Sequence, residues 1–286
     1  MKLSKVWLIL HETYTATMTD RVSRLGAALA FYMTFSLAPL LLVVVAIAGI
    51  VFGRQAAQGQ LFIEMQSVIG HDLAVTVQSL IASAEHQGSG ALAGVIATIT
   101  VLAGALGVFF ELQDMLNMVL GTRDQPDRAL RGFLQRRPLA FLLVVAFGIL
   151  LLASVALSTV VTIVNGVLDR HNSAIRVPEV LMSYFPTVVS FVSVTLVFAL
   201  IYRFLPDMRI AWKSVWIGSF ASSILFSVGK SLLGLYLGHF ATTSVYGAAA
   251  SLIALMLWNY YTAQVILIGA ELMKVHAKHQ AQPRPV

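Results

Sequence analysis

Long stretches without a charged side chain constrain this chain more than any other feature of its sequence. Four of them are residues 25–53, 86–110, 138–168 and 180–202. After Lys213 a fifth stretch continues to Glu271, and Lys230 is the one charged residue within it. About 20 largely apolar residues are enough for a helix to cross a membrane. The fifth stretch is therefore long enough for two spans with a turn between them, and the sequence predicts six transmembrane helices.

We expect an all-α, polytopic integral membrane protein that forms a single domain. The six spans are expected at about residues 27–52, 91–112, 139–164, 182–202, 213–237 and 245–269. A polar tail is expected at residues 275–286. Composition agrees with this class, because 58% of the residues are hydrophobic and 11% are charged, whereas about 25% charged residues is usual in soluble domains.

Two further segments have apolar residues at helical spacing. In residues 3–17 this pattern favours an amphipathic helix that lies in the membrane interface, with a frayed terminus as the alternative. The loop 55–90 contains two short apolar stripes, which favour amphipathic helices on the outer face. A plain structured loop remains the alternative there.

The distribution of basic residues predicts the orientation. The N-terminal segment, the second and fourth loops and the tail together hold 15 of the 19 Lys and Arg residues, whereas the first, third and fifth loops hold 3. Basic residues accumulate on the cytoplasmic side of membrane proteins, so both termini are expected in the cytoplasm. The same bias accounts for the net charge of +6 without a nucleic-acid partner.

Signatures of enzyme chemistry are missing from the sequence. The chain has no cysteine, which excludes thiolate metal sites and Cys nucleophiles. The run from Ser227 to Ser231 resembles the end of a phosphate-binding loop, but Ile224 stands where that motif requires glycine. We therefore expect no enzyme activity, no catalytic residues, no metal and no cofactor.

Ionisable and amide side chains inside spans are costly, so they are the candidate functional residues. Lys230 lies at outer-leaflet depth and is either an interfacial anchor or a cation that faces a cavity. In the last span, Tyr260, Gln264 and Glu271 share one helix face because they are spaced by four and seven residues. This face is expected to turn inward, either to bond neighbouring helices or to line a transport path. The candidate path residues are Lys230, Asn259, Tyr260, Gln264, Tyr32 and Tyr246.

A second group of candidates lies at the cytoplasmic ends of the predicted spans. Acidic and basic residues occur there on several helices, which favours a structural network of ion pairs. Its expected members are Arg24, Glu111, Asp114, Arg203 and Glu271.

Several segments resemble the YihY/BrkB family of bacterial inner-membrane proteins. They are LAFYMTFSLAPLLL from Leu29, GVFFELQDMLNMV from Gly107, YRFLPDMRIAW from Tyr202, GKSLLGLYL from Gly229 and YGAAASLIALMLWNYYTAQVILIGAELMKVHA from Tyr246. The resemblance implies six spans in the inner membrane, a link to virulence, and a ribonuclease label now regarded as misassigned. For a related member, movement of a lipid A precursor has been suggested.

Two hypotheses follow from the residues and the resemblance together. The first is a transporter or flippase of an anionic, amphipathic, lipid-like substrate. The second is a non-catalytic envelope scaffold, with the loop 55–90 and the N-terminal helix as contact surfaces. Membrane lipids are the expected partners in both cases, and a homo-oligomer is left open.

Overall fold

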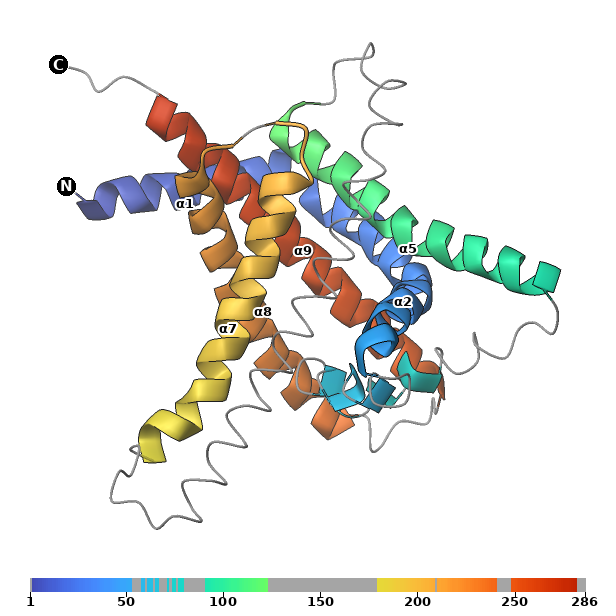
Figure 1. The fold of residues 1–286 in the computed structure, drawn as a ribbon. Coiled ribbons are helices and arrows are strands. Elements are labelled where there is room, and N and C mark those ends of the chain that lie inside the picture. Colours follow the sequence, from blue (N-terminus) through green and yellow to red (C-terminus); the bar gives the residue numbers. More distant parts are fainter. Residues whose placement is uncertain are drawn as a thin grey trace.

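The computed structural model is all-helical over the residues that it describes, which confirms the predicted fold class at this level. The described residues are 2–52, 58–59, 61–63, 65–66, 71, 74–75, 77–79, 91–122, 179–208, 210–240 and 248–281. The helices are α1 (Lys2–Thr19), α2 (Val22–Phe52), α5 (Ala91–Leu120), α7 (Glu179–Phe204), α8 (Trp212–Phe240) and α9 (Ala248–Ala281). Figure 1 shows their arrangement.

Three helical stretches among the described residues are long and apolar enough to cross a membrane. They are Thr187–Phe204 in α7, Trp212–Leu233 in α8 and Leu252–Gln280 in α9. A shorter apolar helix covers Val22–Leu37 at the start of α2. These stretches support a membrane location. The predicted span 139–164 lies outside the described residues, as does most of the loop 55–90, so the count of six spans stays a prediction.

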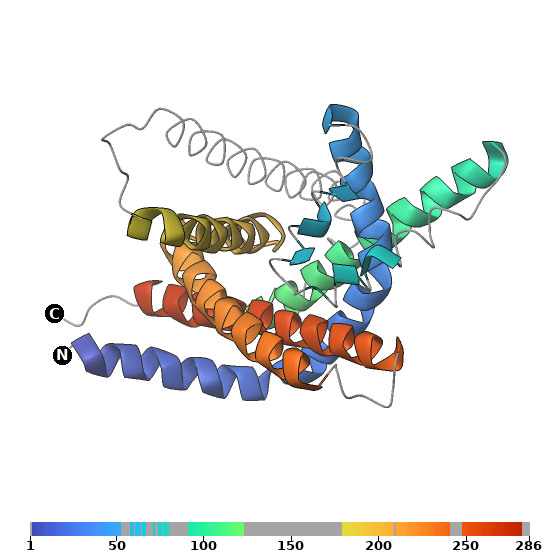
Figure 2. The same ribbon diagram turned by 90° about the horizontal axis from the view of Figure 1, so that it is seen from below.

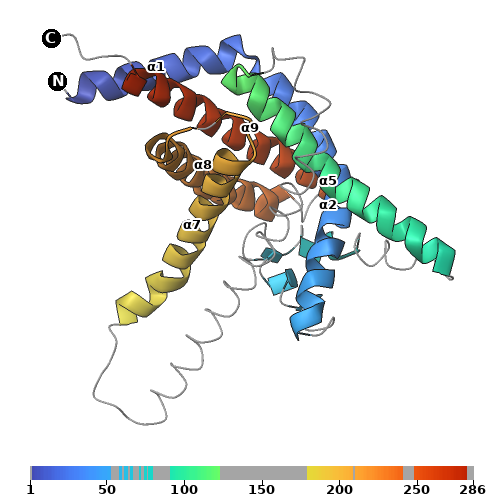
Figure 3. The ribbon, with the colours of Figure 1, turned by 45° about the horizontal axis from the view of Figure 1, so that its top comes forward.

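The last helix, α9, lies at the centre of the described fold. It contacts α1, α2, α5 and α8, while α2 also packs along α5 and α7 along α8. Figure 3 shows α2 and α5 side by side, next to α9. Figure 2 shows α1 running beside the C-terminal part of α9. The predicted interfacial segment 3–17 forms part of α1.

Charged and polar side chains gather where α1 meets α2, where α5 and α7 end and where α8 begins. We call this region the charged end, and its described residues are 11–24, 111–122, 203–208, 210–214 and 271–281. A large apolar cluster packs beside it, with Leu29, Leu116, Tyr202 and Leu267 among its most buried members. A second cluster joins Leu41, Leu61, Val77, Leu255 and Trp258, in the second half of α2 and the first half of α9.

The interface between α8 and α9 depends on close backbone approach. A Cβ atom placed on Gly218 would lie 2.9 Å from the carbonyl oxygen of Gly269 and 3.1 Å from Met273 Cβ. Small residues let membrane helices come this close, so that many weak contacts form along their length. Gly218 therefore fixes how tightly α8 lies on α9.

Candidate functional site

Two amides of the last span bind α2. Asn259, which is 4% exposed, donates from Nδ2 to Thr34 Oγ1 at 3.0 Å. Gln264 donates from Nε2 to the carbonyl oxygens of Val22 and Ser23, each at 3.4 Å. A polar side chain that faced lipid would lose these partners. Both candidate residues therefore point from α9 towards α2, and the contacts of Gln264 lie in the first turn of that helix.

A pair of buried hydroxyl groups, one on α7 and one on α8, joins these two helices to α9. Tyr202 of α7 is fully buried and donates to the carbonyl oxygen of Ile266 in α9 at 2.7 Å. Ser222 of α8 lies 2.7 Å from the Tyr202 hydroxyl and 3.3 Å from the carbonyl oxygen of Val265. Tyr261 of α9 donates in turn to the carbonyl oxygen of Leu225. The middle of α9 therefore makes polar contacts with α2 and with α7 and α8.

Lys230 is partly buried in α8. Ser223 precedes it by seven residues, which places both on one face of the helix. Ser219 and Ser223 are fully buried and donate to carbonyl oxygens one turn back, at 2.8 and 2.9 Å. A stripe of small hydroxyl groups therefore leads along α8 from the charged end towards Lys230.

The remaining path candidates lie in different surroundings. Tyr32 of α2 is 44% exposed and contacts the ring of Phe31 edge-on. Tyr260 of α9 is partly buried. Tyr246 lies outside the described residues.

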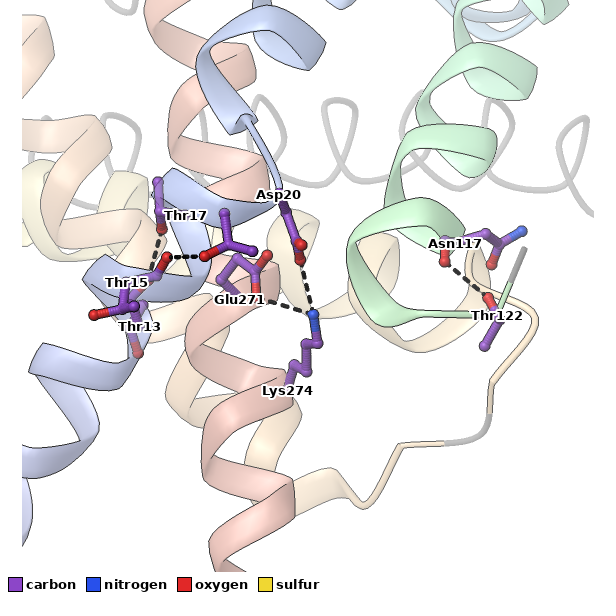
Figure 4. Close-up of polar contacts among 9 residues, drawn as sticks. Thr13, Thr15, Thr17, Asp20, Asn117, Thr122, Glu271 and Lys274 are labelled. Carbon is purple, nitrogen blue, oxygen red and sulfur yellow. Dashed lines mark hydrogen bonds and ion pairs between the residues drawn. The ribbon is translucent and has the colours of Figure 1, made fainter. Parts of the chain in front are cut away.

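Glu271, Lys274 and Asp20 form an ionic cluster at the charged end (Figure 4). Lys274 Nζ lies 2.9 Å from Asp20 Oδ2 and 3.4 Å from Glu271 Oε2. Glu271 is fully buried, whereas Asp20 and Lys274 are about one third exposed. The cluster therefore joins the turn between α1 and α2 to α9. In it, the single ammonium group of Lys274 contacts two carboxyl groups.

Asp20 has a lowered pKa in this cluster. Burial acts to raise that pKa, but the neighbouring Glu271 carboxyl group and the hydrogen bond and positive charge of Lys274 together outweigh the burial. The carboxylate of Asp20 is therefore stabilised by its partners on α9.

Two more contacts join α1 and the start of α8 to α9. His279 Nε2 lies 2.8 Å from Glu12 Oε2, and Ser214 Oγ lies 3.0 Å from His276 Nδ1. Charged and polar groups in the C-terminal part of α9 thus contact both α1 and α8.

The connection between α7 and α8 is tied to α5. Asn117 donates from Nδ2 to Asp207 Oδ2 at 2.9 Å and accepts from the Asp207 backbone N–H at 2.9 Å. Gln113 donates to Asp207 Oδ1 at 3.0 Å. Arg203 donates to the carbonyl oxygen of Ile210 and lies over the Trp212 ring at 5.1 Å. This loop is therefore held from both sides.

The structure distributes the predicted charge-network residues over separate contacts. Glu271 pairs with Lys274 and lies beside Asp20, whereas Arg203 serves the α7–α8 connection. Glu111 is partly buried and Asp114 exposed on α5, and Arg24 is exposed near the start of α2. Sequence reasoning missed Asp20 and Lys274, because they resemble ordinary polar residues at helix ends. It also missed Asp207, although the segment YRFLPDMRIAW contains it.

No group of three or more His, Asp or Glu side chains that could hold a metal ion occurs within the part of the chain that the structure describes.

The chain was compared with known families, curated proteins and solved structures. A family model described as "Virulence factor BrkB" matches residues 13–285, which is nearly the whole chain. No curated protein and no solved structure matches the chain.

Proposed function

The chain belongs to the BrkB virulence factor family, and we propose that it moves an anionic, lipid-like substrate across the bacterial inner membrane. Both termini would lie in the cytoplasm, as the basic residues favour. The observation that carries the proposal is Lys230, a partly buried cation in the apolar stretch Trp212–Leu233. A cation costs about 2.5–3.5 kcal/mol at the centre of a span on insertion scales, and less towards either boundary. An anionic head group would offset this cost.

The surface of α8 supports a lipid-like substrate. Phe220, Leu232 and Leu235 are between 54% and 64% exposed. Acyl chains can cover such apolar side chains, while the head group passes along the side of the helix that contains Ser223 and Lys230. Attraction between unit charges about 4 Å apart is several-fold stronger at a protein surface than in bulk water. Lys230 would then select for a negative head group.

The proposal is tested with the purified protein in proteoliposomes that contain a fluorescent anionic phospholipid. Lys230→Met removes the charge and keeps an apolar stem of similar length, and Lys230→Arg keeps the charge. Lys213→Met is the matched control, because Lys213 is exposed at the other end of the same helix. We expect Lys230→Met to slow transfer between leaflets about tenfold, which corresponds to ~1.4 kcal/mol. Lys230→Arg and Lys213→Met should stay close to the parent protein.

Two outcomes would count against the proposal. If the parent protein accelerates transfer of no envelope lipid, the transport function is wrong. If Lys230→Met folds and transfers lipid at the parent rate, Lys230 is not on the path. A stoichiometric partner that is lost on deletion of residues 61–84 would favour the scaffold alternative.

A further inference from the structure

Glu271 is a buried acid without adequate partners. Its side chain is fully buried, and neither carboxyl oxygen has a hydrogen-bond partner among the described residues. The nearest cation, Lys274 Nζ, lies 3.4 Å away and is closer to Asp20, at 2.9 Å. A buried carboxylate requires compensation by donors or by an opposite charge. Lys274 provides one positive charge for two acids.

The charge count favours one bound proton. With both acids ionised, the cluster of Asp20, Glu271 and Lys274 has one negative charge in excess, and that excess falls on a buried side chain. Two close carboxyl groups resist simultaneous ionisation, so the pair retains a proton. The lowered pKa of Asp20 agrees with this, because the neighbouring Glu271 carboxyl group contributes to it in addition to burial and Lys274. Glu271 is therefore the better proton holder.

Other charged groups surround this cluster at the charged end. Asp20 and Lys274 are the groups that interact with Glu271 within the described part of the chain. The remaining titratable or charged side chains on α9 and the elements packed against it there are His11, Glu12, Tyr14, Arg21, Arg24, Glu111, Asp114, Lys213, His276, Lys278 and His279. Glu12 and His279 form their own pair, and His276 contacts Ser214.

We infer that Asp20 and Glu271 form a proton-binding site that couples movement of the substrate to a proton gradient. The coupling step rests on the proposed function, whereas proton binding itself does not. Asp20 is about one third exposed and Glu271 is fully buried, so a proton enters from water at Asp20 and completes one O–H bond on Glu271. One carboxylate becomes one carboxylic acid, and no electrons are transferred.

Binding or loss of this proton changes how firmly the turn between α1 and α2 is held on α9. Arg21 adopts φ 51°, a left-handed conformation that non-glycine residues seldom adopt. The contact between Asp20 and Lys274 holds this turn on α9. When Glu271 loses its proton, its new charge repels Asp20 and attracts Lys274, so the turn is held less firmly.

Gln264 connects the turn with the middle of α9. It lies seven residues before Glu271, on the same face of α9. Its amide donates to Val22 and Ser23, which follow the turn directly. A displacement of the turn therefore changes the contacts of α2 with α9 on the face that contains the path candidates.

Infrared titration of the full-length protein in liposomes tests the proton site without any transport. We expect a C=O band of a protonated carboxyl group at pH 7 that is missing from Glu271→Gln. Glu12→Gln is the matched control, since it removes a carboxyl group from a neighbouring ion pair on α1, and it should keep the band. Asp20→Asn should lose the band at lower pH than the parent, and Lys274→Gln should keep it to higher pH.

Absence of the band from the parent at pH 7, or its survival in Glu271→Gln, would overturn the proton site. The parent titration decides the matter even if a variant fails to fold. For coupling, lipid transfer is measured with and without an imposed pH gradient. We expect the imposed gradient to change the rate of lipid transfer by the parent severalfold. The rate of transfer by Glu271→Gln should be the same with and without the gradient.

The two proposals fail in different ways. If the parent protein transfers lipid at the same rate with and without the gradient, the coupling is wrong and the transport function still holds. Complete lack of transfer would overturn the transport function, while the infrared band would still decide whether the site binds a proton.

Discussion

At the scale of single residues, spacing along one helix is readable from the sequence, whereas pairing between distant segments is not. The spacing of Gln264 and Glu271 predicts a shared face, and both side chains contact residues near the α1–α2 turn. The partner of Lys274 is Asp20, 254 residues away in the sequence. Only the packing of α1 against α9 brings these two together, so periodicity gives no sign of the pair.

Acid should weaken the contribution of Asp20 to stability. A carboxyl group whose pKa is lowered by folding stabilises the folded state above its unfolded pKa, and this contribution is lost as pH falls through the folded value. The ordinary value is 3.8, and that of Asp20 is lower. We expect Asp20→Asn to melt below the parent at pH 7, and the gap to shrink below about pH 4. Thermal unfolding in detergent, followed by circular dichroism, measures the two melting temperatures at each pH. A difference between them that is as large at pH 3 as at pH 7 would contradict a stabilising role for the Asp20 carboxylate.

The hydrogen bond between Asn259 and Thr34 should be measurable as a coupling energy. Polar contacts between membrane helices average about 0.6 kcal/mol and reach about 1.7. A double-mutant cycle with Asn259→Ala and Thr34→Ala should give a value in this range. Thr195→Ala is the matched control, because Thr195 bonds the carbonyl oxygen of Phe191 in its own helix. Its cycle with Asn259→Ala should give no coupling, and equal values for the two cycles would argue against the contact.

At the scale of helices, charge marks the end of an apolar span but not the end of a helix. Residues 91–112 were predicted as a span, and α5 continues to Leu120. It ends because Gly121 adopts φ 75°, while Thr122 N–H bonds the carbonyl oxygen of Asn117, as in a glycine C-cap. α9 likewise continues past residue 269 to Ala281, since its polar end packs on α1 and α8. These extensions contain the contacts of the charged end, which hydropathy alone does not reveal.

The close approach of α8 and α9 should make Gly218 intolerant of larger side chains. Gly218→Val places a Cβ atom 2.9 Å from a backbone oxygen of Gly269, which can move only with the helix. Overpacking of this kind costs about 1–3 kcal/mol. Gly107→Val is the matched control, since nothing lies within 4 Å of a Cβ atom at Gly107 in α5. Thermal unfolding in detergent should show a large loss for Gly218→Val and a smaller one for the control; equal losses would argue against the close contact.

Asp207 should hold the connection between α7 and α8 on α5. Asp207→Ala removes the acceptor for the amides of Gln113 and Asn117. We expect faster hydrogen–deuterium exchange in residues 205–214, because the loop opens more often without these bonds. Met208→Ala, which changes a neighbouring exposed side chain, is the control. Unchanged exchange in Asp207→Ala would show that the loop is held by other contacts.

At the scale of the whole molecule, the direction of the proposed transport depends on how the protein is oriented in the membrane. The parent chain has no cysteine, so a single introduced cysteine reports its own accessibility. Lys278 is exposed near the C-terminus, and Val75 is 45% exposed in the predicted outer loop. An impermeant maleimide added to intact spheroplasts should label Val75→Cys and not Lys278→Cys. Inverted vesicles should give the opposite result, and labelling of Lys278→Cys from outside would reverse the topology.

The central claim is movement of an anionic, lipid-like substrate, and discrimination by head-group charge tests it most directly. Two fluorescent lipids with the same acyl chains, one anionic and one zwitterionic, are compared in proteoliposomes that contain the parent protein. We expect the protein to accelerate transfer of the anionic lipid about tenfold more than that of the zwitterionic lipid. Equal acceleration of the two lipids, or no acceleration of either, would contradict it.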